Sequence, residues 1–469
     1  MSWRNLIWMM VVLALAALSL YLAGRREVRV QPADPAVDDL AGAIHAYKEI
    51  RRHSLPELSR DDATRGAIDG MARQVDAFST YITPENAGHW KARVEGGLEE
   101  TGLRIARVEG RLVTVGVLPG SPAHHVGLFG GMELLEIDGV AAAYWKLPDA
   151  RRLLERPGKV RLRLRGFDGE VRCVLPSGRF SLPTVSGLVR YDGERWLHVV
   201  EEKPRIVYVR VSEFVEQTPD QFHACYRQLG SPAGVVLDLR GNPGGLLSAA
   251  TEVIDQLLDE GLIVRVVSRE GEPREHYAHG DGTFPRVPLA VLIDSRTASA
   301  AEIVAGCLQA HGRAVLVGQT SFGKWSVQSP LKLGYGLGEV HLTTAEYFLP
   351  PRKLPATQTA AGATTPATAT APAHPRGGLA PDVPVRLTVA AEEELEILRL
   401  QAIAAQPSGP LPTTLPDRRN KAENLERKIL AADAPLAEAV ERLRQRLRPQ
   451  TLPAAATAPA EGAAEEDSP

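Results

Sequence analysis

Apolar positions recur along this chain with different periods, and each period predicts a different kind of structure. Between residues 37 and 95 they recur at helical spacing with few turn signals, as in "LAGAIHAYKEIRRH", which predicts a helical lead-in. Between residues 96 and 166, short apolar runs such as "RLVTVGVL" are separated by Gly and Pro, and one short helix is expected at "LPDARRLLERP". This second pattern predicts a small β-rich module.

A third pattern, of strands followed by helices, fills residues 180–354. The expected strands are "RIVYVRV", "GVVLDLR", "PLAVLID" and "AVLVGQ", and the helices between them are "TPDQFHACYRQL", "LLSAATEVIDQLL" and "SAAEIVAGCLQAH". Strands that alternate with helices are typical of a parallel sheet covered by helices. We therefore expect an α/β core with a mainly parallel sheet, next to the β-rich module and the helical lead-in.

Residues 1–30 predict a membrane segment. No charge occurs from Leu6 to Ala23, and as a helix this run nearly spans a hydrocarbon layer of about 30 Å. A long signal peptide is the alternative, but Tyr21 stands where a cleavage site needs a small residue, which favours an uncleaved anchor. Arg4 precedes the run and three arginines follow it, so the positive-inside rule does not favour export of the rest of the chain.

Three segments towards the carboxyl terminus differ in composition. Residues 355–377 are rich in Ala, Thr and Pro and nearly devoid of charge, which predicts a disordered insertion. Residues 378–447 predict a closing segment and helices, the last of which repeats Leu436, Val440, Leu443 and Leu447 at helical spacing. Residues 448–469 predict a disordered acidic tail.

Composition narrows the classes of function. The chain has 469 residues, of which 44% are hydrophobic, enough for two or three domains with apolar cores. Lys and Arg number 54 against 57 Asp and Glu, so no overall basic field favours a nucleic-acid partner. Cys173, Cys225 and Cys307 lie far apart and outside any metal-ligand spacing. We expect them to be buried apolar thiols, without a disulfide framework or a metal site.

Ser299 is the first candidate for chemistry. It follows the strand "PLAVLID" and the turn "SRTA", and it begins a helix that ends near Gly312. The unpaired N–H groups and the positive dipole end of a helix N-terminus stabilise a developing negative charge, which favours a nucleophilic hydroxyl there. Serine is also a preferred N-cap residue, so a purely structural cap is the alternative.

Lys324 is the candidate general base. After Gly323 the chain is expected to be extended, so that Lys324, Ser326 and Gln328 share one face. A lysine accepts a proton from serine only when it is neutral, so burial must lower its pKa from about 10.4. Gln328 is expected to hold the amine in line by a hydrogen bond. The alternative for Lys324 is an ordinary exposed lysine.

The loop in "GVVLDLRGNPGGLL" is a candidate oxyanion hole. It joins a strand to a helix, and glycines there let backbone N–H groups approach a ligand closely. We expect the N–H of Gly244 or Gly245 to act together with that of Ala300, and a plain strand-to-helix turn is the alternative. Asp238 and Arg240 are expected to form a salt bridge, which either locks this loop or is a simple structural pair.

Three blocks of the sequence resemble the C-terminal processing peptidases, also called tail-specific proteases. They are "TASAAEIVAGCLQAHGRAVLVGQTSFGKWSVQ", "LDLRGNPGGLL" and "VLPGSPAHHVGLFGGMELLEIDGV", the last of which is similar to the core of a PDZ domain. The segments "VDAFSTYITPE" and "GGLAPDVPV" are family-like as well. The resemblance implies a crotonase- or ClpP-like core without a cofactor, in which Ser299 is the nucleophile, Lys324 the general base and Gln328 the residue that orients the lysine.

The PDZ resemblance implies recognition of a peptide tail. A PDZ domain binds a peptide as an added strand and receives its terminal carboxylate in a loop of N–H groups. Similarity places that loop at "TGLRI", so that Gly102, Leu103 and Arg104 face the carboxylate, while Leu103 and Ile105 border an apolar pocket. The expected partners are unstructured polypeptide tails and the membrane, with an activating adaptor or a homo-oligomer as further options.

Departures from the family pattern concern the lysine and the PDZ loop. Trp325 stands where the family usually has a glycine, and its indole is expected to narrow the cleft or to desolvate Lys324 further. Met132 follows Gly131 where Gly-Asp is usual, and Arg104 replaces the more common glycine, so the resemblance does not specify the preferred tail.

Three functions are open at this point. The leading one is a membrane-tethered serine endopeptidase with its catalytic part on the extracytoplasmic, periplasmic side, which cleaves near the C-termini of exported proteins. The second is a catalytically silent or partner-activated PDZ binding protein, which a failure of phosphonates to label Ser299 would favour. The third is a crotonase-like acyl-CoA enzyme, which thioester turnover would favour.

Overall fold

The computed structural model describes most of the chain between residues 40 and 448. The described residues are Trp3, 40–166, 169–192, 195–269, 271–280, 284, 286–352, 377–404 and 415–448. Three predicted segments lie outside the described residues. They are the anchor at 1–30 except for Trp3, the insertion at 355–377 except for Gly377, and the acidic tail at 448–469 except for Arg448. No helix within the described ranges is long and apolar enough to cross a bilayer.

The chain divides into two compact units, residues 1–74 and 75–469. The first holds the helix α3 (Ala41–His53) and all but the last residue of α4 (Arg60–Val75), as the helical periodicity predicts. The second unit begins with the short strand β1 (Thr80–Ile82) and the helix α5 (Pro84–Val94).

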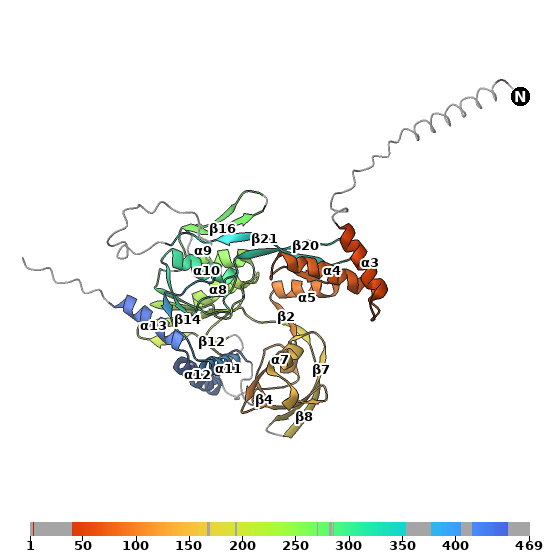
Figure 1. The fold of residues 1–469 in the computed structure, drawn as a ribbon. Helices are drawn as coiled ribbons and strands as arrows, with labels where there is room; N and C mark the ends of the chain where they lie inside the picture. Colours follow the sequence, from red (N-terminus) through yellow and green to blue (C-terminus); the bar gives the residue numbers. More distant parts are fainter. Residues whose placement is uncertain are drawn as a thin grey trace, which may run out of the picture. The chain divides into compact units, whose positions relative to one another are not determined.

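The β-rich module is built on one antiparallel sheet of order β3-β4-β5-β7-β8, with β6 paired to β5 (Figure 1). Its elements are β2 (Gly97–Glu100), β3 (Leu103–Val108), β4 (Arg111–Val117), α6 (Pro122–His125), β5 (Glu133–Ile137), β6 (Val140–Ala141), η1 (Ala142–Tyr144), α7 (Leu147–Glu155), β7 (Lys159–Gly166), β8 (Gly169–Pro176) and β9 (Gly178–Ser181). The structure extends this module beyond the expected end at residue 166, because β8 pairs with β7 along its length. In "GEVRC" the charged residues Glu170 and Arg172 alternate with uncharged ones, so this part of the strand does not form an apolar run in the sequence.

The core sheet has the order β10-β14-β15-β18-β19-β22, with β13 paired to β14. Within this sheet the neighbouring strands β14, β15, β18, β19 and β22 are parallel, which confirms the expected mainly parallel sheet. The strands and their connecting helices are β10 (Val185–Ser186), β13 (Val199–Glu202), β14 (Arg205–Val211), α8 (Thr218–Gln228), β15 (Gly234–Asp238), α9 (Leu247–Asp255), β18 (Leu289–Ile293), α10 (Ala300–Ala310), β19 (Ala314–Gly318) and β22 (Val383–Pro384). A two-stranded ribbon of β11 (Val189–Asp192) and β12 (Arg195–Leu197) lies between β10 and β13 in the sequence.

Both faces of the core sheet are buried, which explains its continuous apolar runs. Val235, Leu237 and Val291 pack with α8, α9 and α10 in one cluster. Val236 and Leu292, their neighbours in sequence, pack in a second cluster with the C-terminal helices α11 (Val389–Ile403), α12 (Leu415–Ala432) and α13 (Ala434–Leu447). Successive side chains on a strand point to opposite faces, so each strand contributes to both clusters.

A second, antiparallel sheet covers the other side of α9 and α10, which lie between β14 and β16 in Figure 1. Its strands are β1, β16 (Gly261–Ser268), β17 (Arg274–Ala278), β20 (Ser326–Lys332) and β21 (Glu339–Phe348). Trp325 and Tyr347 from this sheet join the cluster around α10, so the helix is buried along its whole length.

Cys307 in α10 is buried as expected, whereas Cys173 and Cys225 are half-buried, so the expectation of full burial is wrong for those two. Each of these lies in an element with one face towards solvent, β8 and α8.

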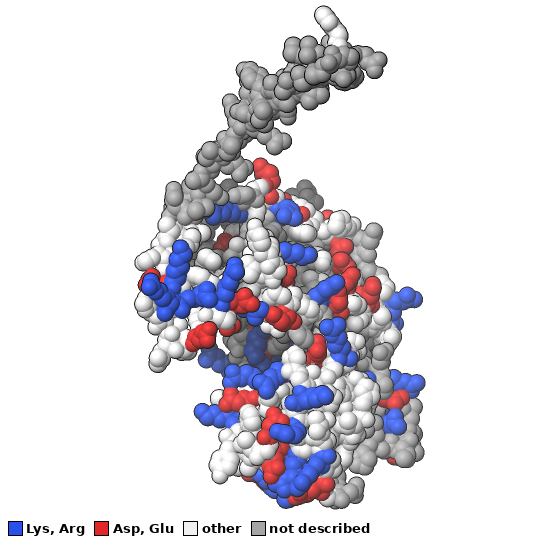
Figure 2. Space-filling model, turned by 90° about the vertical axis from the view of Figure 1, so that its right-hand side faces the viewer, with Lys and Arg blue, Asp and Glu red and all other residues white. Residues whose placement is uncertain are grey.

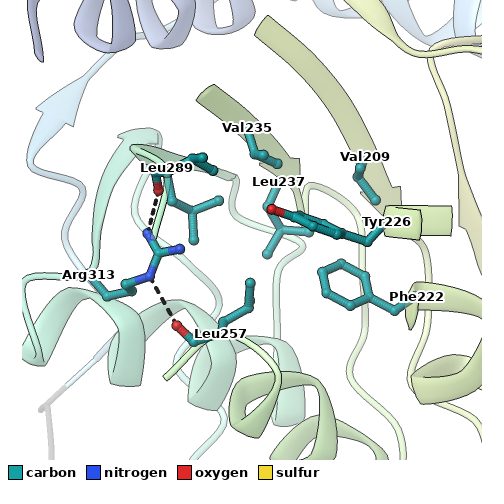
Figure 3. A pocket seen from close by; sticks show the side chains of 9 residues that line it. Val209, Phe222, Tyr226, Val235, Leu237, Leu257, Leu289 and Arg313 are labelled. Atoms are coloured by element: carbon teal, nitrogen blue, oxygen red, sulfur yellow. Dashed lines mark hydrogen bonds between the residues drawn. The ribbon is translucent and has the colours of Figure 1, made fainter. Parts of the chain in front are cut away.

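Beside α8, a cavity of about 10 Å³ is lined by apolar side chains and by Arg313, which donates to the carbonyls of Leu257 and Val287 (Figure 3). A cavity of that size has room for about one water molecule, so it is a packing gap and not a ligand site.

Candidate active site

Ser299 stands between the end of β18 and the start of α10 with an uncommon backbone conformation. Its φ is 58° and its ψ is −124°, whereas an ordinary N-cap residue has an extended backbone with negative φ. A positive φ is strained for a residue other than glycine, and such strain occurs most often at functional sites. The side chain is half-buried, and its Oγ lies 2.8 Å from the hydroxyl oxygen of Tyr347.

Glu302, in the first turn of α10, ties the serine to the lysine. Its Oε2 accepts hydrogen bonds of 2.8 Å from the backbone N–H of Ser299 and from that of Lys324. Its Oε1 accepts from the hydroxyl of Ser321 and the N–H of Gly323. Burial raises the pKa of the Glu302 carboxyl, although these four donors favour its charged form. One carboxylate therefore fixes the backbone of both candidate catalytic residues.

Replacing Glu302 with glutamine is expected to lower the free energy of unfolding by about 1–3 kcal/mol, because an amide turns a donor towards two of the four N–H or O–H groups. Turnover is expected to fall as well, since the serine and the lysine lose their shared anchor. Urea unfolding and peptide cleavage measure both effects. The matched control is Glu252→Gln on the exposed face of α9. Equal effects of the two substitutions would contradict the anchoring role.

Lys324 is half-buried in the segment that joins β19 to β20. Its Nζ lies 5.1 Å from the centre of the Phe78 ring, and no hydrogen bond joins it to Ser299 Oγ or to another described residue. Burial lowers the pKa of the Lys324 amine, while the charges of Asp76 and Glu302 oppose this shift. The side chain thus has the desolvated environment that a general base needs, without a hydrogen bond to the serine in this state.

Gln328 lies on β20, and its amide nitrogen bonds to groups other than the Lys324 amine. It donates to Ser326 Oγ at 2.8 Å and to Thr343 Oγ1 at 3.0 Å. An orienting bond from Gln328 to the Lys324 amine therefore stays a prediction for another state of the site.

The Gly-rich loop lies directly against Ser299. A Cβ added to Gly244 would be 2.8 Å from Ser299 Cβ and 2.9 Å from the nitrogen of Ala300, so only glycine fits there. The N–H of Gly244 donates to Asn242 Oδ1 at 2.8 Å. Within the described residues, the N–H groups of Gly245 and Ala300 donate to no other group. Of the three predicted oxyanion-hole donors, Gly245 and Ala300 are thus the two with a free N–H.

Asp238 and Arg240 form the expected salt bridge at the base of this loop, with Arg240 Nη2 2.6 Å from Asp238 Oδ2. Arg240 also pairs with Asp433, 2.7 Å away and directly before α13. Arg399 of α11 lies 3.0 Å from Asp433, and the Tyr208 hydroxyl donates to Asp238. The pair therefore joins the loop to the C-terminal helices.

The predicted tail-binding loop, residues 101–105, is a loop only at Thr101 and Gly102, because Leu103, Arg104 and Ile105 already belong to β3. This strand forms one edge of the module sheet and packs against α7. Gly102 has a φ of 75°, and the side chains of Leu103 and Ile105 are buried in the core of the module. Arg104 is paired with Glu100 at 2.6 Å. Arg151 of α7 donates to the carbonyl of Ile105 at 3.1 Å, so a peptide that adds to this edge must displace that contact.

Two residues of the site were not predicted from the sequence. Glu302 had a local signal, because a glutamate three residues after a serine at a helix start has the spacing of a capping box. Tyr347 had none, since it lies 48 residues from Ser299 and meets it only through the packing of β21 on α10.

Three comparisons relate this chain to known proteins. Residues 205–360 match peptidase family S41. The carboxyl-terminal-processing protease of Synechocystis sp. is 32% identical over 302 residues, 62% of this chain and 68% of the relative. The carboxy-terminal-processing protease of Bartonella bacilliformis is 32% identical over 314 residues, 65% and 69% of the two chains. A solved structure of a photosystem II D1 C-terminal processing protease covers 78% of this chain and 92% of its own, with 23% identity and a TM-score of 0.43.

Proposed function

Because this chain belongs to the carboxyl-terminal-processing proteases of peptidase family S41, and is a serine-type peptidase, we propose that Ser299 and Lys324 are its catalytic dyad. The observation that carries this proposal is the shared oxygen of Glu302, which holds the backbone nitrogens of both residues at 2.8 Å. A lysine side chain anchored this close to the serine reaches its Oγ by rotating away from Phe78. Catalytic hydrogen bonds often form only in the substrate complex.

In this proposal the neutral amine of Lys324 takes the proton of Ser299 Oγ as that oxygen attacks the scissile carbonyl. The N–H groups of Gly245 and Ala300 stabilise the negative charge that develops on the carbonyl oxygen. The Lys324 ammonium then gives its proton to the leaving amine, and water releases the acyl group by the reverse sequence.

The β-rich module is proposed to be a PDZ domain that captures the C-terminal tail of the substrate. Support comes from the position of β3 at the edge of the sheet beside α7, where a peptide can add as a strand once it displaces Arg151, and from the left-handed turn at Gly102. On the face shown in Figure 2, basic and acidic side chains are interspersed, so recognition is expected to depend on short-range contacts and not on a field of one sign.

The uncharged run from Leu6 to Ala23 supports the further proposal that the protein is tethered to a membrane, with its catalytic part on the extracytoplasmic side. A protease held there meets the tails of exported proteins. Fractionation of cells, followed by protease accessibility of the chain in intact spheroplasts, distinguishes this location from a cytoplasmic one.

Tail recognition is tested with a pair of peptides that differ only in a free or an amidated C-terminus. We expect the free form to be cleaved with at least a tenfold lower KM, because amidation removes the charge-assisted hydrogen bonds of the carboxylate. Binding of both peptides to Ser299→Ala, measured by calorimetry, separates recognition from cleavage. Equal cleavage of the two peptides would contradict the proposed role of the module. Failure of a serine-directed phosphonate to label Ser299 would contradict the dyad.

A further inference from the structure

Tyr347 is the side chain that the structure brings to the nucleophile. It lies near the end of β21 with only 3% of its surface exposed, and its hydroxyl oxygen is 2.8 Å from Ser299 Oγ. That distance is typical of a hydrogen bond between two hydroxyl groups. Neither the family-like blocks quoted above nor the proposed dyad includes this residue.

The Tyr347 phenol is held in place by its surroundings. Its backbone N–H donates to the carbonyl of Trp325 at 3.0 Å, and the two rings meet edge to face with centroids 6.1 Å apart. Trp325 is itself buried, and its indole N–H donates to the carbonyl of Gly377 at 2.7 Å. These contacts therefore fix the ring in one orientation, with its hydroxyl directed at Ser299.

We propose that Tyr347 is a further catalytic residue, whose hydroxyl donates a hydrogen bond to Ser299 Oγ whenever that oxygen carries negative charge. The inference rests on the proposed role of Ser299 as nucleophile. In acylation, Oγ gains charge as Lys324 removes its proton and the bond to the carbonyl carbon forms. In deacylation, the bond between that carbon and Oγ breaks, and Lys324 returns a proton to Oγ. Tyr347 keeps its own proton in both steps.

The surroundings of Tyr347 favour a donor over a base. Burial raises the pKa of its phenol well above the usual value, the hydrogen bond with Ser299 lowers it, and the charge of Glu302 raises it further. The phenol is therefore neutral around neutral pH, and it has a proton to donate. The amine of Lys324, whose pKa is lowered by burial, is the group that accepts the serine proton.

Tyr347→Phe tests the proposal, because it removes one oxygen and keeps the ring. We expect kcat to fall about 100-fold, the size of the loss when one donor to a developing charge is removed, with KM unchanged within twofold. Hydrolysis of a preformed acyl-enzyme should slow as well, since Oγ is the leaving group of that step. The matched control is Tyr277→Phe, which removes an exposed phenol from strand β17 of the same sheet.

A merely structural role would change the unfolding temperature and leave the acyl-enzyme hydrolysis rate of the folded protein at the wild-type value. If Tyr347→Phe does not fold, 3-fluorotyrosine at position 347 is the second variant. It keeps the shape of the ring and makes the phenol more acidic, so its kcat is expected to differ from that of the wild type. Wild-type kcat in both variants, or a higher kcat in Tyr347→Phe, would overturn the proposal. Ser299→Ala keeps the two failures distinguishable. An active Ser299→Ala would overturn the proposed dyad and, with it, this inference, whereas an inactive Ser299→Ala together with wild-type kcat in Tyr347→Phe would overturn the role of Tyr347 alone.

Discussion

Ser299→Ala is expected to lower turnover of an unstructured peptide by about 10⁴-fold or more, since removal of the nucleophile of a serine protease has effects of that order. The backbone of Ser299 is fixed by Glu302 and by the start of α10, so the loss of one oxygen leaves the fold unchanged. Cleavage kinetics and thermal unfolding measure the two properties. The control is Ser295→Ala, four residues earlier on the exposed part of the same turn, which should cleave at the wild-type rate.

Lys324→Ala should cause a loss of similar size, because the proposed dyad acts as a unit. The wild-type rate should also rise with pH and reach a plateau, since only the neutral amine accepts the serine proton. Burial lowers the pKa of Lys324, so the plateau is expected at a lower pH than an exposed lysine would give. A rate that does not depend on pH through this range, or turnover by Lys324→Ala near the wild-type rate, would contradict the assignment of the base.

The strands of the core could be predicted from the sequence because both faces of the sheet are buried. Runs such as "PLAVLI" have no polar interruption, and the helices α8 and α9 have one buried apolar face. The strand β8 was missed because about half of its residues are exposed and two of them, Glu170 and Arg172, are charged. A buried strand appears in the sequence as a run of apolar residues, whereas an exposed edge strand that is held by backbone hydrogen bonds gives no such run.

The candidate site was predictable only as far as its chemistry is local. Ser299 and Lys324 each follow a strand at the carboxyl edge of the parallel sheet, where functional residues of such sheets gather. Glu302 is within one helical turn of Ser299. By contrast, Tyr347 and Asp433 reach their partners through the packing of whole elements, and no spacing in the sequence encodes a contact across that distance. The family resemblance implies roles for Ser299 and Lys324, but it implies none for Glu302 or Tyr347, which contact Ser299 in the structure.

Arg240→Ala is expected to lower the free energy of unfolding by about 3–5 kcal/mol, because it leaves the buried carboxylates of Asp238 and Asp433 without their main partner. The guanidinium is 4% exposed and bonds to both oxygens of each carboxylate. Arg399 compensates only in part, since its closest contact to Asp433 is 3.0 Å and to Asp238 3.5 Å. The control is Arg419→Ala, whose ion pair with Glu423 is exposed and should contribute less than about 1 kcal/mol.

The pH dependence of this difference follows from the two carboxyl groups. Although burial alone would raise them, the neighbouring guanidinium groups hold the pKa values of Asp238 and Asp433 below the usual value. A carboxyl whose pKa is lower in the folded state stabilises the fold above its unfolded pKa of about 4, and this contribution is lost as the pH falls through the lowered value. The gap between wild type and Arg240→Ala should therefore narrow below about pH 4. Unfolding curves in guanidinium chloride at several pH values measure this gap. A gap that stays constant as the pH falls would show that Arg240 stabilises the fold through packing and not through its charge.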